Sequence, residues 1–188
     1  MKTELQLYFI ALLPPEPIFD EVMDYKKLFA NKYDSKTGLK SPPHITLHMP
    51  FRLKEKKEEA LGQSLTTLAT NTDKFEIALN GFGHFNQRTI FIDVEANDSL
   101  HALFKNIMKS MKVNFNIFNA DYKNRGFNPH LTLAFRDLKK ESFNEAWPHF
   151  KDQPYHNKFI SDGFVLLKHN GKSWDVYQTF KFKKGPEA

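Results

Sequence analysis

The spacing of hydrophobic residues along the chain predicts short strands interleaved with amphipathic helices. Apolar residues at helical spacing predict four helices, which cover Pro17–Tyr33, a stretch from Lys54 that carries Leu61, Leu65 and Leu68, residues 97–111, and Glu141–Phe150. Alternating or continuous apolar runs predict seven strands, at Leu5–Leu13, His44–His48, Phe75–Leu79, Ile90–Val94, His130–Leu133, Lys158–Leu167 and Trp174–Phe182. Pro50 is expected to end the second strand, and Gly81 and Gly83 to bracket a turn.

The predicted elements repeat along the chain. Each half runs strand, helix, short Pro-His strand, helix, strand, and Phe9 precedes His44 by 35 residues much as Phe91 precedes His130 by 39. This similarity predicts two lobes of like topology related by a pseudo-twofold axis. No linker rich in Pro, Gly or Ser separates them, so we expect residues 1–188 to form a single bilobal domain. Its halves are expected near 1–88 and 89–188, and exchange of the terminal strands between them is left open.

Composition and charge narrow the function classes. The chain has 188 residues, of which 40% are hydrophobic and 26% charged, as in globular proteins. It contains no cysteine, which excludes a disulfide scaffold, a cysteine metal site and a catalytic thiol. The net charge of +5 favours anionic partners. The longest apolar run is shorter than a membrane helix needs, so we expect a cytoplasmic protein without a membrane partner.

A repeated pentapeptide carries the candidate chemistry. Pro43-His44-Ile45-Thr46-Leu47 returns as Pro129-His130-Leu131-Thr132-Leu133. Side chains alternate across a strand, so each copy buries two aliphatic residues and presents an imidazole beside a hydroxyl on the other face. Two imidazoles that meet across the pseudo-twofold could act as general base and general acid near neutral pH. The two hydroxyls could hold the non-bridging oxygens of a phosphodiester.

Other residues could extend this site. Arg136 could reach a phosphate, and Phe85 could stack on a base. His48 has the strand parity of His44 and could approach it, but no carboxylate cluster accompanies these histidines, so we expect no metal site and no cofactor. The alternative interpretation is that the histidines are structural, that Arg136 is a solvated surface residue and that Phe85 only packs in the core.

The twin His-x-Thr motifs and the duplicated order of elements resemble the 2H phosphoesterase superfamily, in particular its 2′–5′ RNA ligase and 2′,3′-cyclic nucleotide phosphodiesterase branch. The resemblance implies a bilobal α+β fold in which two antiparallel sheets line a central cleft, with helices outside. It also implies metal-independent catalysis by His44 and His130, with Thr46 and Thr132 on the phosphate. Arg136 lies near a basic position of many relatives, and Phe85 follows a matching Gly81-Phe82-Gly83-His84 segment.

We therefore expect a phosphoesterase that hydrolyses a 2′,3′-cyclic phosphate, or a related cyclic or 2′–5′ phosphodiester, of RNA or a nucleotide. The reverse reaction would be 2′–5′ RNA ligation. A nucleotide- or RNA-binding module without catalysis and an RNA 3′-end phosphodiesterase remain as alternatives. We expect a monomer with no protein partner. The sequence leaves open which histidine is the acid and which the base.

Overall fold

The computed structural model describes residues 4–95, 97–118 and 126–183. Within them the chain forms four α-helices, which are α1 (Ile18–Lys32), α2 (Glu58–Thr70), α3 (Asp98–Phe115) and α4 (Lys140–Phe150), and two short 3₁₀ turns, η1 (Thr37–Lys40) and η2 (Glu55–Lys57). The strands are β1 (Leu5–Leu12), β2 (Ile45–Lys54), β3 (Phe75–Phe85), β4 (Thr89–Val94), β5 (His130–Ala134), β6 (His156–Ser161), β7 (Gly163–His169) and β8 (Trp174–Lys181). None of the helices in these residues is long and apolar enough to cross a membrane.

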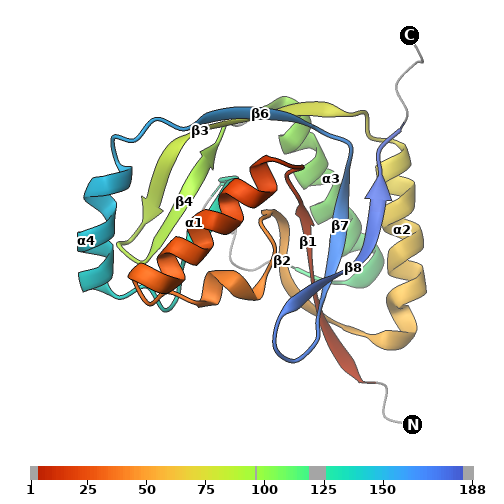
Figure 1. The fold of residues 1–188 in the computed structure, drawn as a ribbon. Helices are drawn as coiled ribbons and strands as arrows, with labels where there is room; N and C mark the ends of the chain where they lie inside the picture. Colours follow the sequence, from red (N-terminus) through yellow and green to blue (C-terminus); the bar gives the residue numbers. More distant parts are fainter. Residues whose placement is uncertain (1–3, 96, 119–125, 184–188) are drawn as a thin grey trace.

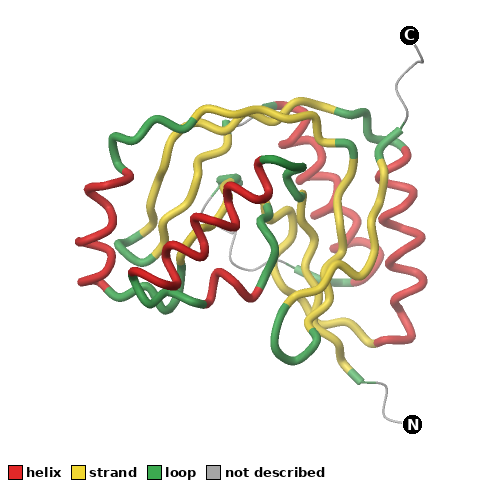
Figure 2. Tube along the Cα trace, viewed as in Figure 1, coloured by secondary structure: helices red, strands yellow, loops and turns green. Residues whose placement is uncertain are grey.

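The strands form one curled antiparallel sheet in the order β6-β3-β4-β5-β2-β1-β7-β8 (Figures 1 and 2). This is the α+β architecture that the resemblance implies. Two groups of four strands meet where β2 lies beside β5, and a single residue pair, Ile45 with Leu131, joins them there. The two expected sheets are therefore the halves of one continuous sheet. The His44 half holds β1, β2, β7 and β8, whereas the His130 half holds β3, β4, β5 and β6.

Two helices each cover the half of the sheet to which their neighbouring strands in the chain do not belong (Figure 1). Helix α1 leaves the His44 half and packs against β5 of the other half, and α3 packs against β2. Helix α2 packs against β8 and α3. Helix α4 contacts β3, where the rings of Phe143 and Trp147 lie against His84. Each half of the sheet is thus covered by helices from both parts of the chain.

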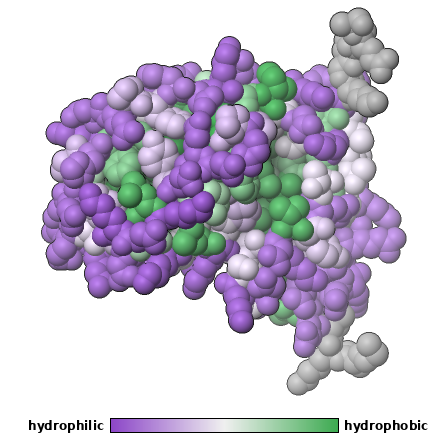
Figure 3. All heavy atoms as spheres, viewed as in Figure 1, coloured by the Kyte–Doolittle hydropathy of each residue, from purple (hydrophilic) through white to green (hydrophobic). Residues whose placement is uncertain are grey.

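One large hydrophobic core joins the two halves. It contains buried residues of β1, β2, β3, β4, β5 and all four helices. A smaller cluster on the opposite face of the sheet is made of Phe9, Ala11, Val165 and Leu167, with Leu13 and Trp174 packed against it. Figure 3 shows that mostly hydrophilic side chains cover the side of the molecule that carries α1, with smaller hydrophobic patches between them. The second cluster contains no helical residue, so no helix packs on this part of the sheet face.

Three predicted strand ends are wrong. Pro50 does not stop the second strand, because β2 continues to Lys54 and the proline lies where the register with β1 is shifted by a bulge, a place that needs no ladder donor. Gly81 and Gly83 do not form a turn but lie within β3, with a bulge near Gly81, whose φ is 71°. The run Lys158–Leu167 is two strands, β6 and β7, separated at Asp162.

Candidate functional site

The two copies of the pentapeptide meet at the centre of the sheet. The pair Ile45–Leu131 sets an antiparallel register that brings His44 level with Thr132 and Thr46 level with His130. The aliphatic residues of both copies are fully buried in the large core. Alternation along each strand therefore turns the two histidines and two threonines to the other face, which we call the histidine face.

Each motif imidazole is held in the same way. Nδ1 of His44 lies 2.7 Å from the carbonyl oxygen of Pro42, and Nδ1 of His130 lies 2.8 Å from that of Asn128. A carbonyl oxygen only accepts, so Nδ1 carries the hydrogen and Nε2 of the neutral ring keeps its lone pair. The remaining nitrogen of each ring is thus available for proton transfer.

Two phenylalanines form matching supports for these rings. The ring centroid of Phe9 lies 4.8 Å from that of His44, and the centroid of Phe91 lies 4.8 Å from that of His130. The interplanar angles are 50° and 48°. Sequence reasoning did not assign these residues to the site, although they mark equivalent positions of the repeat and that spacing could have identified them.

The surroundings of the two histidines favour their neutral forms to different extents. Burial lowers the pKa of His44 to about 3, and the nearby positive charge of Lys26 acts in the same direction. Burial also lowers the pKa of His130, but the carboxylate of Asp93 acts against this. An anionic ligand between the rings would raise both pKa values, because it stabilises the imidazolium form.

The two threonines are positioned to donate hydrogen bonds. Both are half-buried, and neither hydroxyl has a hydrogen-bond partner among the residues that the structure describes. A hydroxyl can rotate its hydrogen toward an acceptor. Thr46 and Thr132 can therefore both donate a hydrogen bond to an anion that binds between the histidines.

Phe85 packs beside His130. Its ring centroid is 5.1 Å from that of His130 and 4.4 Å from that of Phe91. Gly83 makes this packing possible, because a Cβ at that position would overlap the ring of Phe91. The aromatic segment next to His130 thus depends on a glycine in the middle of β3.

Arg136 is not grouped with the histidines. It follows β5 with φ at 62° and lines a cavity of about 430 Å³ together with Asn86, Gln87, Arg88 and residues 137–140. Its guanidinium lies over the ring of Phe135, 5.4 Å from the centroid. Arg136 and Arg88 therefore line a basic cavity whose lining includes neither His44 nor His130.

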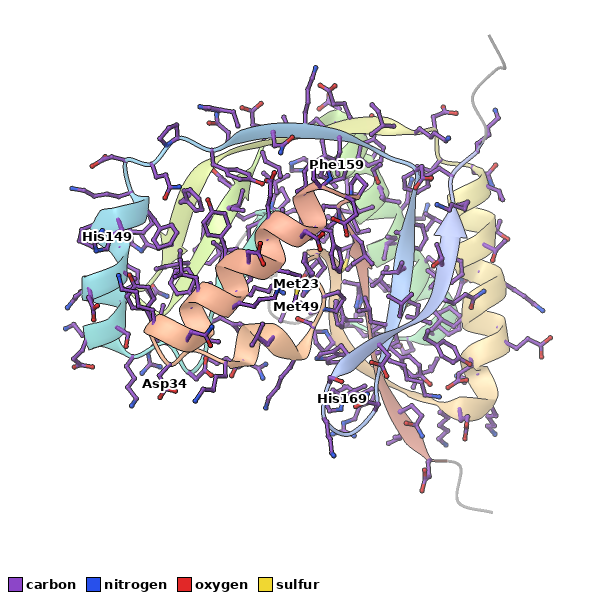
Figure 4. All side chains as sticks on the ribbon, in the orientation of Figure 1. Met23, Asp34, Met49, His149, Phe159 and His169 are labelled. Carbon is purple, nitrogen blue, oxygen red and sulfur yellow. The ribbon has the colours of Figure 1, made fainter. Side chains whose placement is uncertain are left out.

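The suggestion that His48 approaches His44 is wrong. The β1–β2 register shifts between the pairs Ala11–Thr46 and Ile10–His48, and this bulge turns His48 into the large core, where it is 1% exposed. Its ring lies edge-on to Phe51, and Nε2 has no partner among the described residues. His149 on α4 lies at the left edge of the molecule, and His169 at the end of β7 lies at its lower centre (Figure 4).

Two residues near the pair escaped sequence reasoning. Trp174 of β8 packs against Phe9 at 4.6 Å between centroids, which extends an apolar surface from His44 across the histidine face. Lys26 of α1 is 2% exposed, and its Nζ donates to the carbonyl oxygen of Ser41 at 2.9 Å. Burial lowers the pKa of this amine to about 7. The sequence does hold a sign of this residue, because Lys26 falls at helical spacing among the buried apolar residues of α1.

Comparison with known sequences gives a family match and named relatives. The family described as the 2′-5′ RNA ligase superfamily matches residues 14–173. A protein of Geobacillus sp. (strain WCH70) that carries a phosphoesterase name is 32% identical over 177 residues, which cover 92% of this chain and 94% of the relative. A similarly named protein of Oceanobacillus iheyensis is 30% identical over 176 residues, with 92% and 96% covered.

Solved structures with the same fold support this relationship. The protein TT0787 of Thermus thermophilus superposes with a TM-score of 0.70 at 20% identity, covering 97% of this chain and all of that protein. Escherichia coli LigT complexed with 3′-AMP gives 0.71 at 17% identity, with 96% and 100% covered. At these identities the structures establish the fold alone. The family match over residues 14–173 and the relative at 32% identity show that the chain belongs to the 2′-5′ RNA ligase superfamily, the 2H phosphoesterases.

Proposed function

We propose that the protein is a phosphoesterase that hydrolyses 2′,3′-cyclic phosphates, or related cyclic or 2′–5′ phosphodiesters, of RNA or nucleotides with the two motif histidines as acid and base. The observation that supports this most strongly is the matched pair of imidazoles on one face of the sheet. Each ring donates Nδ1–H to the carbonyl oxygen two residues before it. Each therefore keeps Nε2 for exchange of a proton with a reactant.

The hydrolysis uses one neutral and one protonated imidazole. The neutral ring takes a proton from water at Nε2 while the water oxygen forms a bond to phosphorus. The protonated ring gives its Nε2 proton to the ribose oxygen as the bond between that oxygen and phosphorus breaks. Thr46 and Thr132 donate hydrogen bonds to the non-bridging oxygens, where negative charge develops in the transition state. With a ribose 5′-hydroxyl in place of water, the same steps form a bond from that oxygen to phosphorus, break the bond to the 3′-oxygen of the cyclic phosphate, and leave a 2′–5′ phosphodiester.

Aromatic and basic residues suggest a nucleotide or RNA substrate. We propose that Phe85 stacks on a base next to His130 and that Trp174 offers an apolar surface on the His44 side. LigT has been crystallised with 3′-AMP and with NADP⁺, which supports a nucleotide ligand for a chain with this fold. Arg136 is proposed to bind a phosphate of the substrate, with Arg88 from the same cavity.

The mechanism needs neither a metal ion nor a cofactor, because proton transfer by the histidines and hydrogen bonds from the threonines supply the catalysis. The direct experiment is a screen of 2′,3′-cyclic nucleotides and of 2′–5′ and 3′–5′ dinucleotides in saturating EDTA, with products identified by phosphorus NMR. We expect a cyclic phosphate to open to a single monoester. Activity that EDTA abolishes and one divalent ion restores would contradict the metal-free mechanism.

The same screen separates the alternatives. Stoichiometric binding of nucleotides without turnover of any diester would indicate a binding module. Removal of nucleotides from the 3′ end of an oligonucleotide, with no action on cyclic mononucleotides, would indicate a 3′-end phosphodiesterase. Variants His44→Asn and His130→Asn serve as matched controls for a contaminating activity.

A further inference from the structure

The two histidines are held alike but have neighbours of opposite charge. Their Nδ1 bonds and their phenylalanine supports are equivalent. The charged groups that act on them are not, because Lys26 acts on His44 and Asp93 acts on His130. This asymmetry can distinguish the roles of two otherwise equivalent imidazoles.

Lys26 brings a buried amine to the His44 side. Helix α1 packs on β5 and η1. Its lysine stem lies close to Gly38, because a Cβ added to that glycine would be 3.8 Å from Cγ of Lys26. Nζ donates to the carbonyl oxygen of Ser41, three residues before His44. The next carbonyl along the chain, that of Pro42, holds Nδ1 of His44. Lys26 therefore fixes the segment that orients the imidazole.

No carboxylate neutralises this amine within the part of the chain that the structure describes. Phe9 from β1 packs against the ring of His44, and the charges that act on this ring are those of Lys26 from α1 and His130 from β5. A cation near an imidazole disfavours a second positive charge on the ring. Lys26 thus favours the neutral, proton-accepting form of His44.

Asp93 brings a carboxylate to the His130 side. It lies directly opposite His130 in the register of β4 and β5, so the two side chains share the histidine face. One carboxylate oxygen accepts from the backbone N–H of Val94 at 3.0 Å, and no ion pair engages the group among the described residues. The other groups that face His130 are Phe85, Phe91 and His44. The carboxylate favours the protonated, proton-donating form of His130.

We propose that the charges of Lys26 and Asp93 determine the roles of the two histidines, with His44 as the general base and His130 as the general acid. The assignment rests on the proposed two-histidine reaction. Neither Lys26 nor Asp93 is proposed to touch the reacting atoms, so both act as positioning residues through their histidines. In hydrolysis, water loses its proton to His44, and the departing ribose oxygen receives its proton from His130.

Titration of the imidazole protons by NMR tests the charges without requiring turnover. In Lys26→Gln, which keeps a donor for Ser41 but removes the charge, we expect the titration midpoint of His44 to rise by roughly one pH unit while that of His130 stays nearly constant. In Asp93→Asn we expect the midpoint of His130 to fall by a smaller amount, because the carboxylate is exposed and screened. His44→Asn and His130→Asn assign the resonances.

Two neighbouring residues supply matched controls. Lys27→Gln removes an exposed lysine from the next position of α1, where it pairs with Asp24, and Glu95→Gln removes an exposed carboxylate just after β4. Neither should move the two midpoints. Circular dichroism verifies that Lys26→Gln is folded, and Asp93→Asn tests the other half of the proposal independently. Midpoints that do not move, or that move in the opposite directions, would overturn it.

Kinetics with two leaving groups tests the roles themselves. A p-nitrophenyl leaving group needs no protonation, so His130→Asn should cost on the order of 100-fold or more with a ribose leaving group and little with p-nitrophenol. His44→Asn should cost activity on both substrates. The reverse pattern would overturn the assignment. If the wild-type protein turned over no diester, the proposed function would fail, while the NMR midpoints would still decide whether Lys26 and Asp93 polarise the pair.

Discussion

At the scale of single residues, the candidate site consists of side chains whose protonation is set by their surroundings. A buried imidazole loses the hydration that stabilises its charge, and neighbouring charges then adjust the balance. His44 and His130 show both effects. The sequence predicted these two histidines and their threonines because the motif occurs twice. It did not predict Lys26 or Asp93, because their relation to the pair depends on how α1 and β4 are placed in space.

The pH dependence of activity should reflect these shifts. In the free protein the acid must be protonated and the base neutral, so kcat/KM should fall as pH rises through the lowered pKa of His130, below about 6.5. The limb at low pH should lie well below this, because the pKa of His44 is about 3. Both limbs belong to the interacting pair.

Bound substrate should change this profile in a defined direction. A phosphodiester anion favours the imidazolium form, so the upper limb of kcat should lie at higher pH than that of kcat/KM. Rate measurements over the range from about pH 4 to about pH 9 on one cyclic nucleotide give the upper limb of both profiles. A kcat/KM that keeps rising to about pH 8 would contradict the expected protonation states.

His48 should make the folded state sensitive to acid. Burial holds its pKa below the usual value, so the unfolded chain binds the proton more readily. Its contribution to stability is present above about pH 6.5 and is lost as pH falls toward the folded pKa, by up to about 1.4 kcal/mol per pH unit. His48→Leu should therefore reduce the loss of stability between about pH 6.5 and about pH 5. Chemical denaturation at several pH values measures the difference, and equal slopes in both proteins would contradict it.

At the scale of elements, local patterns predicted the helices well and the strand ends less well. All four helices appear near their predicted bounds, because an apolar stripe at helical spacing is packed onto one core. Pro50 and Gly81 were expected to mark strand ends but lie within strands, and the break at Asp162 was not predicted. A bulge accommodates a proline or a glycine without ending the strand, and whether a bulge forms depends on the partner strand. A second register shift, between Thr46 and His48, explains why His48 points into the core instead of toward His44.

The glycine in the middle of β3 should be essential to the His130 side. Gly83→Ala should displace the ring of Phe91, which supports His130, and should destabilise the fold by roughly 1–3 kcal/mol. Gly126→Ala is the matched control, because a Cβ at Gly126 would meet nothing within 4 Å. Thermal unfolding and kcat measure the two effects. Wild-type stability and rate in Gly83→Ala would show that the ring has room to move.

At the scale of the whole molecule, the twofold repeat builds the site and the sheet at once. The repeat in the sequence predicted two similar halves, but not that one residue pair would join them into a continuous sheet or that α1 would cover the opposite half. Those features arise from long-range pairing, which local patterns do not encode. The same arrangement places Arg136 in a basic cavity whose lining includes neither histidine.

The position of Arg136 predicts which substrates it affects. If it binds a phosphate of an oligonucleotide, Arg136→Ala should weaken oligonucleotide binding and reduce the slope of log affinity against log salt by about one charge unit. Turnover of a cyclic mononucleotide should change little, because neither histidine lines the cavity that holds Arg136. Fluorescence anisotropy at several salt concentrations measures the slope. An unchanged slope would show that Arg136 does not contact the nucleic acid.

The central claim is that His44 and His130 act together as base and acid, and the kcat of the two single variants and the double variant on a 2′,3′-cyclic nucleotide in EDTA tests it most directly. Each of His44→Asn and His130→Asn should lower kcat by about 10²–10⁴. Because the residues act as a unit, the double variant should be barely slower than the slower single variant. Near wild-type rates in both single variants would contradict the account, as would losses that multiply fully in the double variant.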